Sequence, residues 1–496
     1  MEKKNKKLYV IFLIFIVILS IGIVEKSMQN DTFFTIAIAR DMIDRGGLDG
    51  LDHLTQHEGL NFTHSGWIFD LIIYGAYSAL GFFGIYLVTI IVSIIIFIVL
   101  FNVFLKEENN IVLSFIFTIV SIFISRGVLA ARGQIFSFLI FVLELYAIVN
   151  LTRTGKKRYI ISLLVLPIIL ANTHDTVWPF YFVLFLPYIA EAFFSKIEIL
   201  LNKEESYKVE VKEVKYWKTL LIIMVISAFT GLITPVFGTA YINLFTVMAG
   251  VSKNFISELQ QVDLLSTLPL LTIVVFTIGV VGFTKTKIRL KDLLFVFGFV
   301  ILSLMAIRNC FFLYLLGIVS VCNIFTKFLK TYGKEMYLEY ITDIIVNNKI
   351  YLFLISILII LISVTSFVGQ IEEEYVNDFY YPVEAVEWMK KNINFDEMTI
   401  YNGFNYGSYL ELNGIKVFMD SRSGMYCEEF TEGSTIMTDY LNVESGTEHY
   451  EKTFKNYGIT HALIYNETII NQYISEDLNY ECIYQDDIFA LYERVK

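Results

Sequence analysis

The sequence is poor in charge and in cysteine, and each shortage narrows what the protein can be. Charged residues make up only 18% of the chain, whereas hydrophobic residues make up 56% and the mean hydropathy is +0.61. This balance excludes a soluble enzyme with a single anchor, because soluble domains are about one-quarter charged. Four cysteines in 496 residues form no disulfide framework, and the spacing of Cys427 and Cys482 leaves open whether these two pair.

Long apolar runs are the dominant feature. A helix needs about 20 mostly apolar residues to cross a bilayer, and hydropathy predicts about eleven such spans. No A-x-A-like cleavage site follows the first run, which predicts a retained signal anchor. The predicted spans are 8–24, 84–105, 111–128, 133–151, 159–173, 177–194, 219–234, 265–283, 292–307, 310–326 and 350–368.

The distribution of Lys and Arg predicts the orientation. With the N-terminus in the cytoplasm, the segments on that side carry 23 of the 38 Lys and Arg residues, and the intervening outer loops carry 7. Basic residues are retained on the cytoplasmic side, above all in short loops. An odd number of spans then places the tail outside. The predicted domains are a transmembrane domain at 1–369, with a first extracytoplasmic loop and interfacial helices at 25–83, and an extracytoplasmic domain at 370–496.

The tail is acidic and has a mixed pattern. It holds 8 basic and 24 acidic residues, which argues against a nucleic-acid partner and against docking on an anionic membrane surface. Helical spacing predicts helices at 382–392 and 449–457. Alternation predicts strands at 398–401, 408–412, 416–419, 461–465 and 488–492. The predicted fold class is therefore a polytopic α-helical membrane protein with a small C-terminal α/β domain.

Ionisable residues gather at the outer ends of the predicted spans. Asp31 follows the first span, and Arg126, Arg132, His174 and Arg308 lie at the ends of later ones. Such residues are costly near membrane depth and indicate a functional site. Each also has a structural interpretation, since a carboxylate can cap the following helix and arginines can snorkel to the interface. Their presence on one face favours the functional interpretation.

The first outer loop carries three histidines, His53, His57 and His64. Their spacing matches no zinc signature, so a divalent metal is left open and no other cofactor is predicted. Four residues are candidates for substrate binding: Asp52, His53, His64 and His174.

The compartment limits the chemistry. No nucleotide-sugar or ATP pool exists outside the cytoplasm, so a transferase facing outward needs an energised donor delivered by the membrane, such as a polyprenyl-phosphate-linked sugar. Guanidinium groups bind phosphate oxygens bidentately, which fits Arg126, Arg132 and Arg308. A carboxylate can take the proton of the acceptor hydroxyl, and Asp31 is placed for that role.

This layout resembles the GT-C membrane glycosyltransferases, and within them the bacterial integral membrane proteins related to the GT39/ArnT-like group. The resemblance covers most of the chain in order. It is carried by Asp31-Thr32-Phe33-Phe34, His64-Ser65-Gly66-Trp67, Ala131-Arg132-Gly133-Gln134, Ala171-Asn172-Thr173-His174, Asn405-Tyr406-Gly407 and Asp420-Ser421-Arg422. The chain departs from the pattern at Gly133, where relatives tend to have Pro, and at Asp175, where they often have Gly.

The resemblance implies a glycosyltransferase in the bacterial plasma membrane, with Asp31 as general base and an extracytoplasmic glycan, lipid or protein as acceptor. Many GT-C enzymes carry a second early acidic residue, and Asp41, Asp44 and Asp52 are the candidates here. Two other functions stay open. One is a transporter or flippase of lipid-linked sugars, and the other is a non-catalytic scaffold in surface-polymer assembly.

Overall fold

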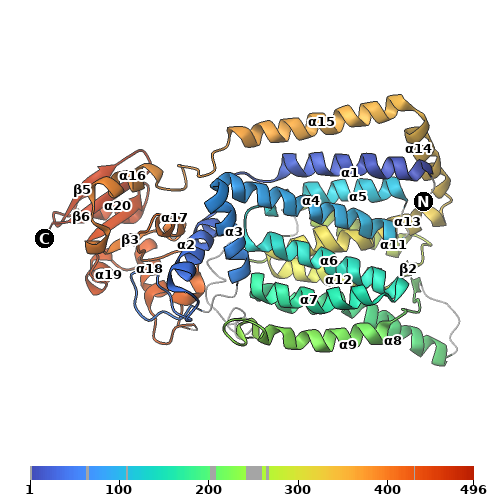
Figure 1. The fold of residues 1–496 in the computed structure, drawn as a ribbon, viewed down its shortest axis with the longest axis horizontal. Coiled ribbons are helices and arrows are strands. Elements are labelled where there is room, and N and C mark those ends of the chain that lie inside the picture. Colours follow the sequence, from blue (N-terminus) through green and yellow to red (C-terminus); the bar gives the residue numbers. More distant parts are fainter. Residues whose placement is uncertain are drawn as a thin grey trace. The chain divides into compact units, whose positions relative to one another are not determined.

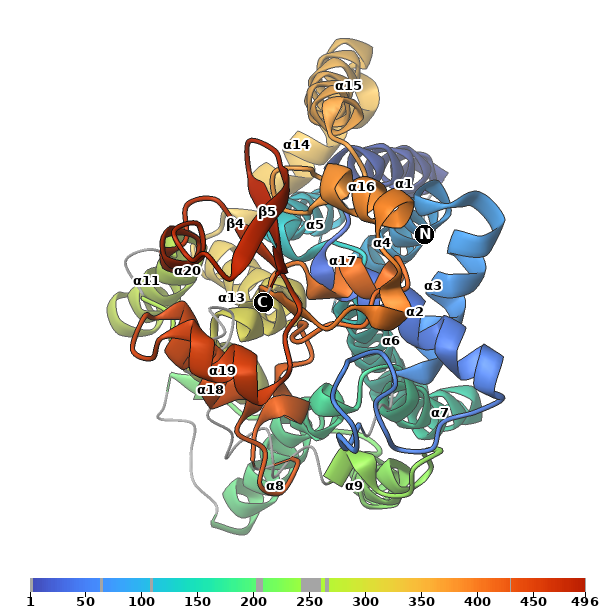
Figure 2. The same cartoon turned by 90° about the vertical axis from the view of Figure 1, so that its left-hand side faces the viewer.

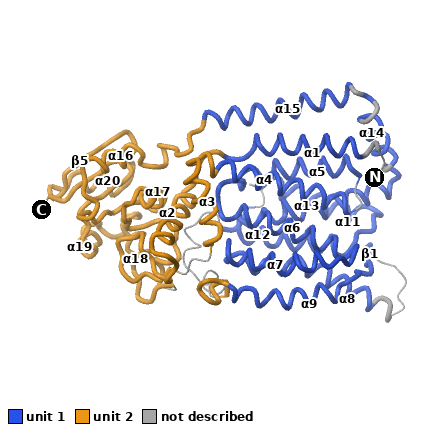
Figure 3. Tube along the Cα trace, in the orientation of Figure 1, with its two compact units in different colours: residues 1–25, 86–233, 256–372 blue, residues 26–85, 234–255, 373–496 orange. Residues whose placement is uncertain are grey.

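The computed structural model describes residues 3–62, 66–107, 110–201, 208–241, 260–263, 267–428 and 430–495. The chain forms two compact units, drawn in different colours in Figure 3. The membrane unit comprises residues 1–25, 86–233 and 256–372, and the α/β unit comprises residues 26–85, 234–255 and 373–496.

The membrane unit is built from apolar helices (Figure 1). Among the described residues, six helical segments are long and apolar enough to cross a membrane. Each predicted span overlaps a helix, so the polytopic helical architecture is confirmed, while the number of spans stays a prediction. The helices and strands are α1 (Lys3–Ile23), α4 (Phe82–Lys106), α5 (Ile111–Ile124), η1 (Arg126–Val128), α6 (Gly133–Thr154), α7 (Lys157–Thr173), η2 (Asp175–Leu184), α8 (Leu186–Leu201), β1 (Val209–Glu210), α9 (Trp217–Ala228), η3 (Phe229–Leu232), α11 (Leu268–Phe283), β2 (Ile288–Arg289), α12 (Leu290–Met305), η6 (Ile307–Asn309), η7 (Phe312–Gly317), α13 (Ile318–Thr331), α14 (Glu335–Asn347) and α15 (Lys349–Glu372).

Two local features show how the helices of this unit pack. Gly22 allows α1 to approach α15 closely, because a Cβ atom at this position would lie 2.7 Å from the carbonyl oxygen of Ser363. Pro167 lies inside α7 and has no N–H to donate to the carbonyl of Leu163. The hydroxyl of Tyr181 donates to that carbonyl instead, at 2.7 Å. The bilayer offers no water for this purpose, so the bond satisfies a group that the proline leaves open.

The α/β unit contains a four-stranded sheet with the order β3-β4-β6-β5. Strand β3 runs parallel to β4, and the other two pairs are antiparallel. The elements of this unit are α2 (Asn30–Arg45), α3 (Trp67–Leu80), α16 (Val383–Asn392), η8 (Phe395–Glu397), β3 (Ile400–Asn402), α17 (Gly407–Leu412), η9 (Ser423–Tyr426), α18 (Ile436–Glu444), α19 (Tyr450–Asn456), β4 (His461–Tyr465), α20 (Ile469–Ile474), β5 (Tyr480–Gln485) and β6 (Phe489–Arg494).

The sheet buries one face against helices. Ala462 and Ile464 of β4 and Ala490 and Tyr492 of β6 belong to one hydrophobic cluster with residues of α18, α19 and α20. Alternate residues of a strand face the same side, so these three helices cover that face. Figure 2 shows them together on one side of β4 and β5.

The predicted α/β pattern of the tail is confirmed, with two errors. The helices at 382–392 and 449–457 and the strands at 398–401, 461–465 and 488–492 correspond to α16, α19, β3, β4 and β6. The strand predicted at 408–412 is wrong, because this segment forms the helix α17. Short apolar runs do not distinguish helix from strand. The strand predicted at 416–419 is reduced to one bridge between Val417 and Thr55.

Candidate active site

Asp31 lies in the first turn of α2, in the α/β unit. The helix starts after Gln29, whose backbone is extended and whose N–H donates to the hydroxyl of Thr32 at 3.4 Å. A carboxylate in the first turn interacts favourably with the helix dipole. Asp31 is half-buried.

Contacts with the tail hold α2 in place. Asn30 Nδ2 donates to the carbonyl oxygen of Phe404 at 3.0 Å, and Arg40 Nη1 donates to that of Leu412 at 3.1 Å. The ring of Phe33 is fully buried. These contacts join α2 to the C-terminal tail. They therefore fix the position of the helix and of the backbone at Asp31.

Neither of the acidic residues further along α2 can pair with Asp31. A helix rises about 1.5 Å per residue, so Asp41 lies about 15 Å and Asp44 about 20 Å along the axis from Asp31. These separations exceed the reach of two carboxylates on one reacting carbon, which are about 5–9.5 Å apart in glycosidases. Of the three candidates for a second acid, only Asp52 is left.

Asp52 is part of a buried ion network centred on Arg422. The guanidinium of Arg422 lies 2.6 Å from Asp52 Oδ1, 2.6 Å from Glu411 Oε1 and 2.5 Å from Asp420 Oδ2. The second oxygen of Asp52 accepts hydrogen bonds from the N–H and hydroxyl of Thr55, at 2.9 and 2.6 Å. Both oxygens of Asp52 are thus engaged inside the protein, and the ion pair joins the first loop to the tail.

The network carries more carboxylates than cations. Burial raises the pKa of Glu411 well above its usual value, because Arg422 offsets only part of the desolvation. Burial also acts to raise the pKa of Asp420, but the charge of Arg422 and the hydrogen bonds to Asp420 hold it below its usual value. Sequence reasoning missed Glu411, which lay inside the segment predicted as a strand.

The two described histidines of the first loop, His53 and His57, have different partners. His53 Nε2 lies 3.0 Å from Asp49 Oδ2 on the protein surface, and His57 Nε2 donates to the carbonyl oxygen of Phe418 at 2.8 Å. His64 lies outside the described residues. Within the described ranges, no group of three or more His, Cys, Asp or Glu residues could hold a metal ion.

In the membrane unit, the structure brings together residues from three helix ends. Gln134 and Ser137 of α6, His174 after α7, and Arg308 and Asn309 of η6 line one small cavity of about 10 Å³. The hydroxyl of Ser137 lies 2.7 Å from His174 Nδ1. A cavity of this volume holds about one water molecule. His174 and Arg308 are both residues that the sequence pattern singled out.

Hydrogen bonds fix both ends of the turn that carries Arg308. The N–H of Ile307 donates to the carbonyl oxygen of Gln260 at 3.0 Å, and Asn309 Nδ2 donates to that of Leu302 at 3.1 Å. The π-helix η7 follows almost directly, and such segments occur often at functional sites. Arg126 is exposed on η1 and Arg132 is half-buried before α6, and neither lines the cavity around Arg308.

Comparisons with known proteins identify the fold. No protein-family model and no curated protein matches the chain. The oligosaccharyltransferase AglB from Archaeoglobus fulgidus, solved with an inhibitory peptide and a dolichol-phosphate, matches 94% of this chain and 70% of its own, at 10% identity and a TM-score of 0.58. ArnT from Cupriavidus metallidurans, solved with undecaprenyl phosphate, matches 99% of this chain and 98% of its own, at 10% identity and a TM-score of 0.54. The chain has the fold of the GT-C membrane glycosyltransferases.

Proposed function

We propose that the protein is a glycosyltransferase that moves a sugar from a polyprenyl-phosphate-linked donor to an extracytoplasmic glycan, lipid or protein. The observation that carries the proposal is the likeness to ArnT over 99% of this chain. Both compared proteins hold a polyprenyl phosphate of the kind that such a donor would release.

Arg308 and His174 support the donor part of the proposal. A guanidinium offers paired N–H groups to phosphate oxygens, and Ser137 and Gln134 add polar side chains beside it. The cavity between them is too small for a phosphate group, so the phosphate would bind at its mouth or after a movement of these side chains. Arg126 and Arg132 remain further candidates for this role.

Asp31 supports the acceptor part. As general base it would take the proton of the acceptor hydroxyl while that oxygen attacks the anomeric carbon. The bond from the anomeric carbon to the phosphate oxygen breaks, and polyprenyl phosphate leaves with the bonding electrons. Because Asp41 and Asp44 are far along α2 and Asp52 is held by Arg422, a single carboxylate carries the base role in this proposal.

The test compares three proteins of equal yield and melting temperature: wild type, Asp31→Asn and Asp44→Asn. Asp44 is an exposed residue of the same helix and serves as the matched control. Each is incubated with a panel of polyprenyl-phosphate sugars, and the release of polyprenyl phosphate is followed by mass spectrometry. We expect turnover by wild type and Asp44→Asn and a loss of about 10²–10⁴-fold in Asp31→Asn.

Two outcomes would contradict the proposal. Turnover that survives in Asp31→Asn would support the transferase function but exclude Asp31 as its general base. Absence of turnover with every donor would favour the non-catalytic scaffold.

A further inference from the structure

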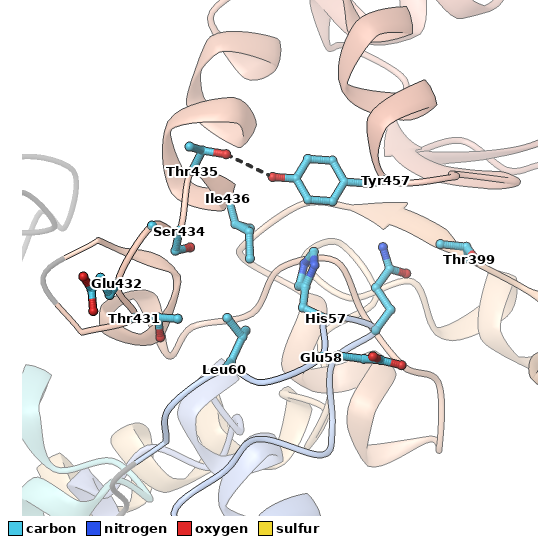
Figure 4. Close-up of a pocket in the computed structure, with 12 residues that line it drawn as sticks. His57, Glu58, Leu60, Thr399, Thr431, Glu432, Ser434, Thr435, Ile436 and Tyr457 are labelled. Carbon is cyan, nitrogen blue, oxygen red and sulfur yellow. Dashed lines mark hydrogen bonds between the residues drawn. The ribbon is translucent and has the colours of Figure 1, made fainter.

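The α/β unit has a polar pocket of about 430 Å³ whose lining includes neither Asp31 nor a residue of the Arg422 network. Its volume falls within the range of small-molecule sites, about 300–1,000 Å³. Figure 4 shows the side chains around it, with Thr435 and Tyr457 on one edge and Leu60 and Glu58 on the other. It is lined by Gln56, His57, Glu58, Leu60, Thr399, Thr431, Glu432, Gly433, Ser434, Thr435, Ile436 and Tyr457.

The first loop forms a preorganised wall of this pocket. The N–H of Gln56 donates to the carbonyl oxygen of Val417 at 3.0 Å, and Gln56 Oε1 accepts the N–H of Ile400 at 3.0 Å. His57 is held in the same way by its bond to Phe418. A wall that is already fixed costs less entropy when a ligand binds. Gln56 Nε2 is buried and has no hydrogen-bond partner among the described residues.

The opposite wall presents oriented hydroxyl groups. Thr435 and Tyr457 both donate to Asp439 Oδ2, at 2.8 and 2.7 Å. Burial, together with the hydrogen bond to Asp439, raises the pKa of Tyr457 to about 12, so its phenol stays neutral. With their protons directed at Asp439, the two oxygens keep lone pairs that can accept hydrogen bonds from a ligand.

The charges that line the pocket disfavour anionic ligands. None of its twelve lining residues is Lys or Arg, and Glu58 and Glu432 are both exposed at its rim. Burial lowers the pKa of His57, which keeps the imidazole neutral at pH 7. Among the described residues, the lining therefore combines carboxylate, hydroxyl and amide groups with the half-buried ring of Tyr457, while Leu60 and Ile436 are buried beneath it, and it offers no cation.

We propose that this pocket binds an uncharged carbohydrate. Sugar hydroxyls would donate to Glu58, Glu432, Thr435 and Tyr457, and a C–H face of the sugar would pack on the ring of Tyr457. Polyols suit such a lining because each hydroxyl both donates and accepts, whereas phosphate and uronic acid groups would meet two carboxylates and no cation. The proposal does not depend on glycosyl transfer, since it concerns binding to a separate site.

The test measures binding by the full-length protein in detergent, in the Asp31→Asn background. The probe is an array of hexose and N-acetylhexosamine oligomers together with their sulfated and uronic-acid counterparts. We expect retention of neutral oligomers and not of the anionic ones. The double variant Glu58→Gln/Glu432→Gln removes two surface carboxylates without touching the core, and we expect it to weaken binding by about tenfold or more.

Glu476→Gln is the matched control, because Glu476 is equally exposed in the same unit and does not line the pocket. The proposal is wrong if no neutral oligomer binds, if the anionic oligomers bind as well as the neutral ones, or if the control weakens binding as much as the double variant. Release of polyprenyl phosphate is a separate readout. If the protein is not a transferase, neutral oligomers should still bind. If the pocket does not bind carbohydrate, polyprenyl phosphate should still be released by wild type.

Discussion

Replacing Arg422 with methionine tests whether the ion network stabilises the α/β unit. The substitution keeps much of the side-chain volume but leaves Asp52, Glu411 and Asp420 without their shared cation, and all three side chains are fully buried. Removing one partner of a buried ion pair costs about 3–5 kcal/mol. For a domain of this size, each kcal/mol lowers Tm by about 2–4 °C, so we expect a decrease of about 6–20 °C.

The assay is differential scanning fluorimetry of the full-length protein in detergent, with limited proteolysis to locate the loosened unit. Lys416→Met is the control, since it removes a cation from an exposed position in the same unit. Cleavage should appear first in the first loop, which Asp52 ties to the tail. A change in Tm of less than about 2 °C, or equal changes in both variants, would refute the assigned role of the network.

Three further predictions concern other parts of the molecule. Because burial raises the pKa of Glu411, the folded state binds a proton that the unfolded state releases, so stability falls as pH rises from about 4.5 through the raised value. Glu411→Gln should flatten this decline in a series of Tm measurements from pH 4 to 9. A slope equal to that of wild type would show that Glu411 is not the group responsible. Arg308→Gln should raise KM for the donor by about 10–100-fold in the turnover assay, against no change for Arg153→Gln, which replaces an exposed arginine in the last turn of α6, and equal effects would contradict a specific role. Gly22→Ala should lower Tm because its Cβ would meet the backbone of Ser363, whereas Gly279→Ala, which has no neighbour within 4 Å, should not.

The sequence predicted those features that depend on local patterns. Each predicted span overlaps a helix, because apolar runs of bilayer length have few alternatives to a helix in lipid. His174 and Arg308 were singled out as ionisable residues at helix ends on one face, and the structure places them in one cavity. The same pattern also singled out Arg126 and Arg132, which do not line this cavity, so the sequence did not predict which of these residues would share it.

The features that could not be predicted depend on contacts between distant residues. Asp52 and Arg422 are 370 positions apart, and no periodicity of either segment records that they meet. The same limit applies to Gly407, which precedes the segment 408–412 that was wrongly predicted as a strand. Gly407 lies where a Cβ atom would be 1.9 Å from the carbonyl oxygen of Met419, so the glycine serves a close approach at the start of α17, and alternation along the chain does not reveal this.

The engagement of Asp52 also changes how the first loop is interpreted. Asp52 was a candidate for substrate binding, yet its two oxygens accept three hydrogen bonds from Arg422 and Thr55, and its side chain is fully buried. A substrate would have to displace at least one of these bonds. Asp52→Asn therefore separates the two roles: a structural residue lowers Tm with KM unchanged, whereas a substrate ligand raises KM at constant Tm. The geometry favours the first result, and Asp31 then remains the carboxylate on which the proposed transfer depends.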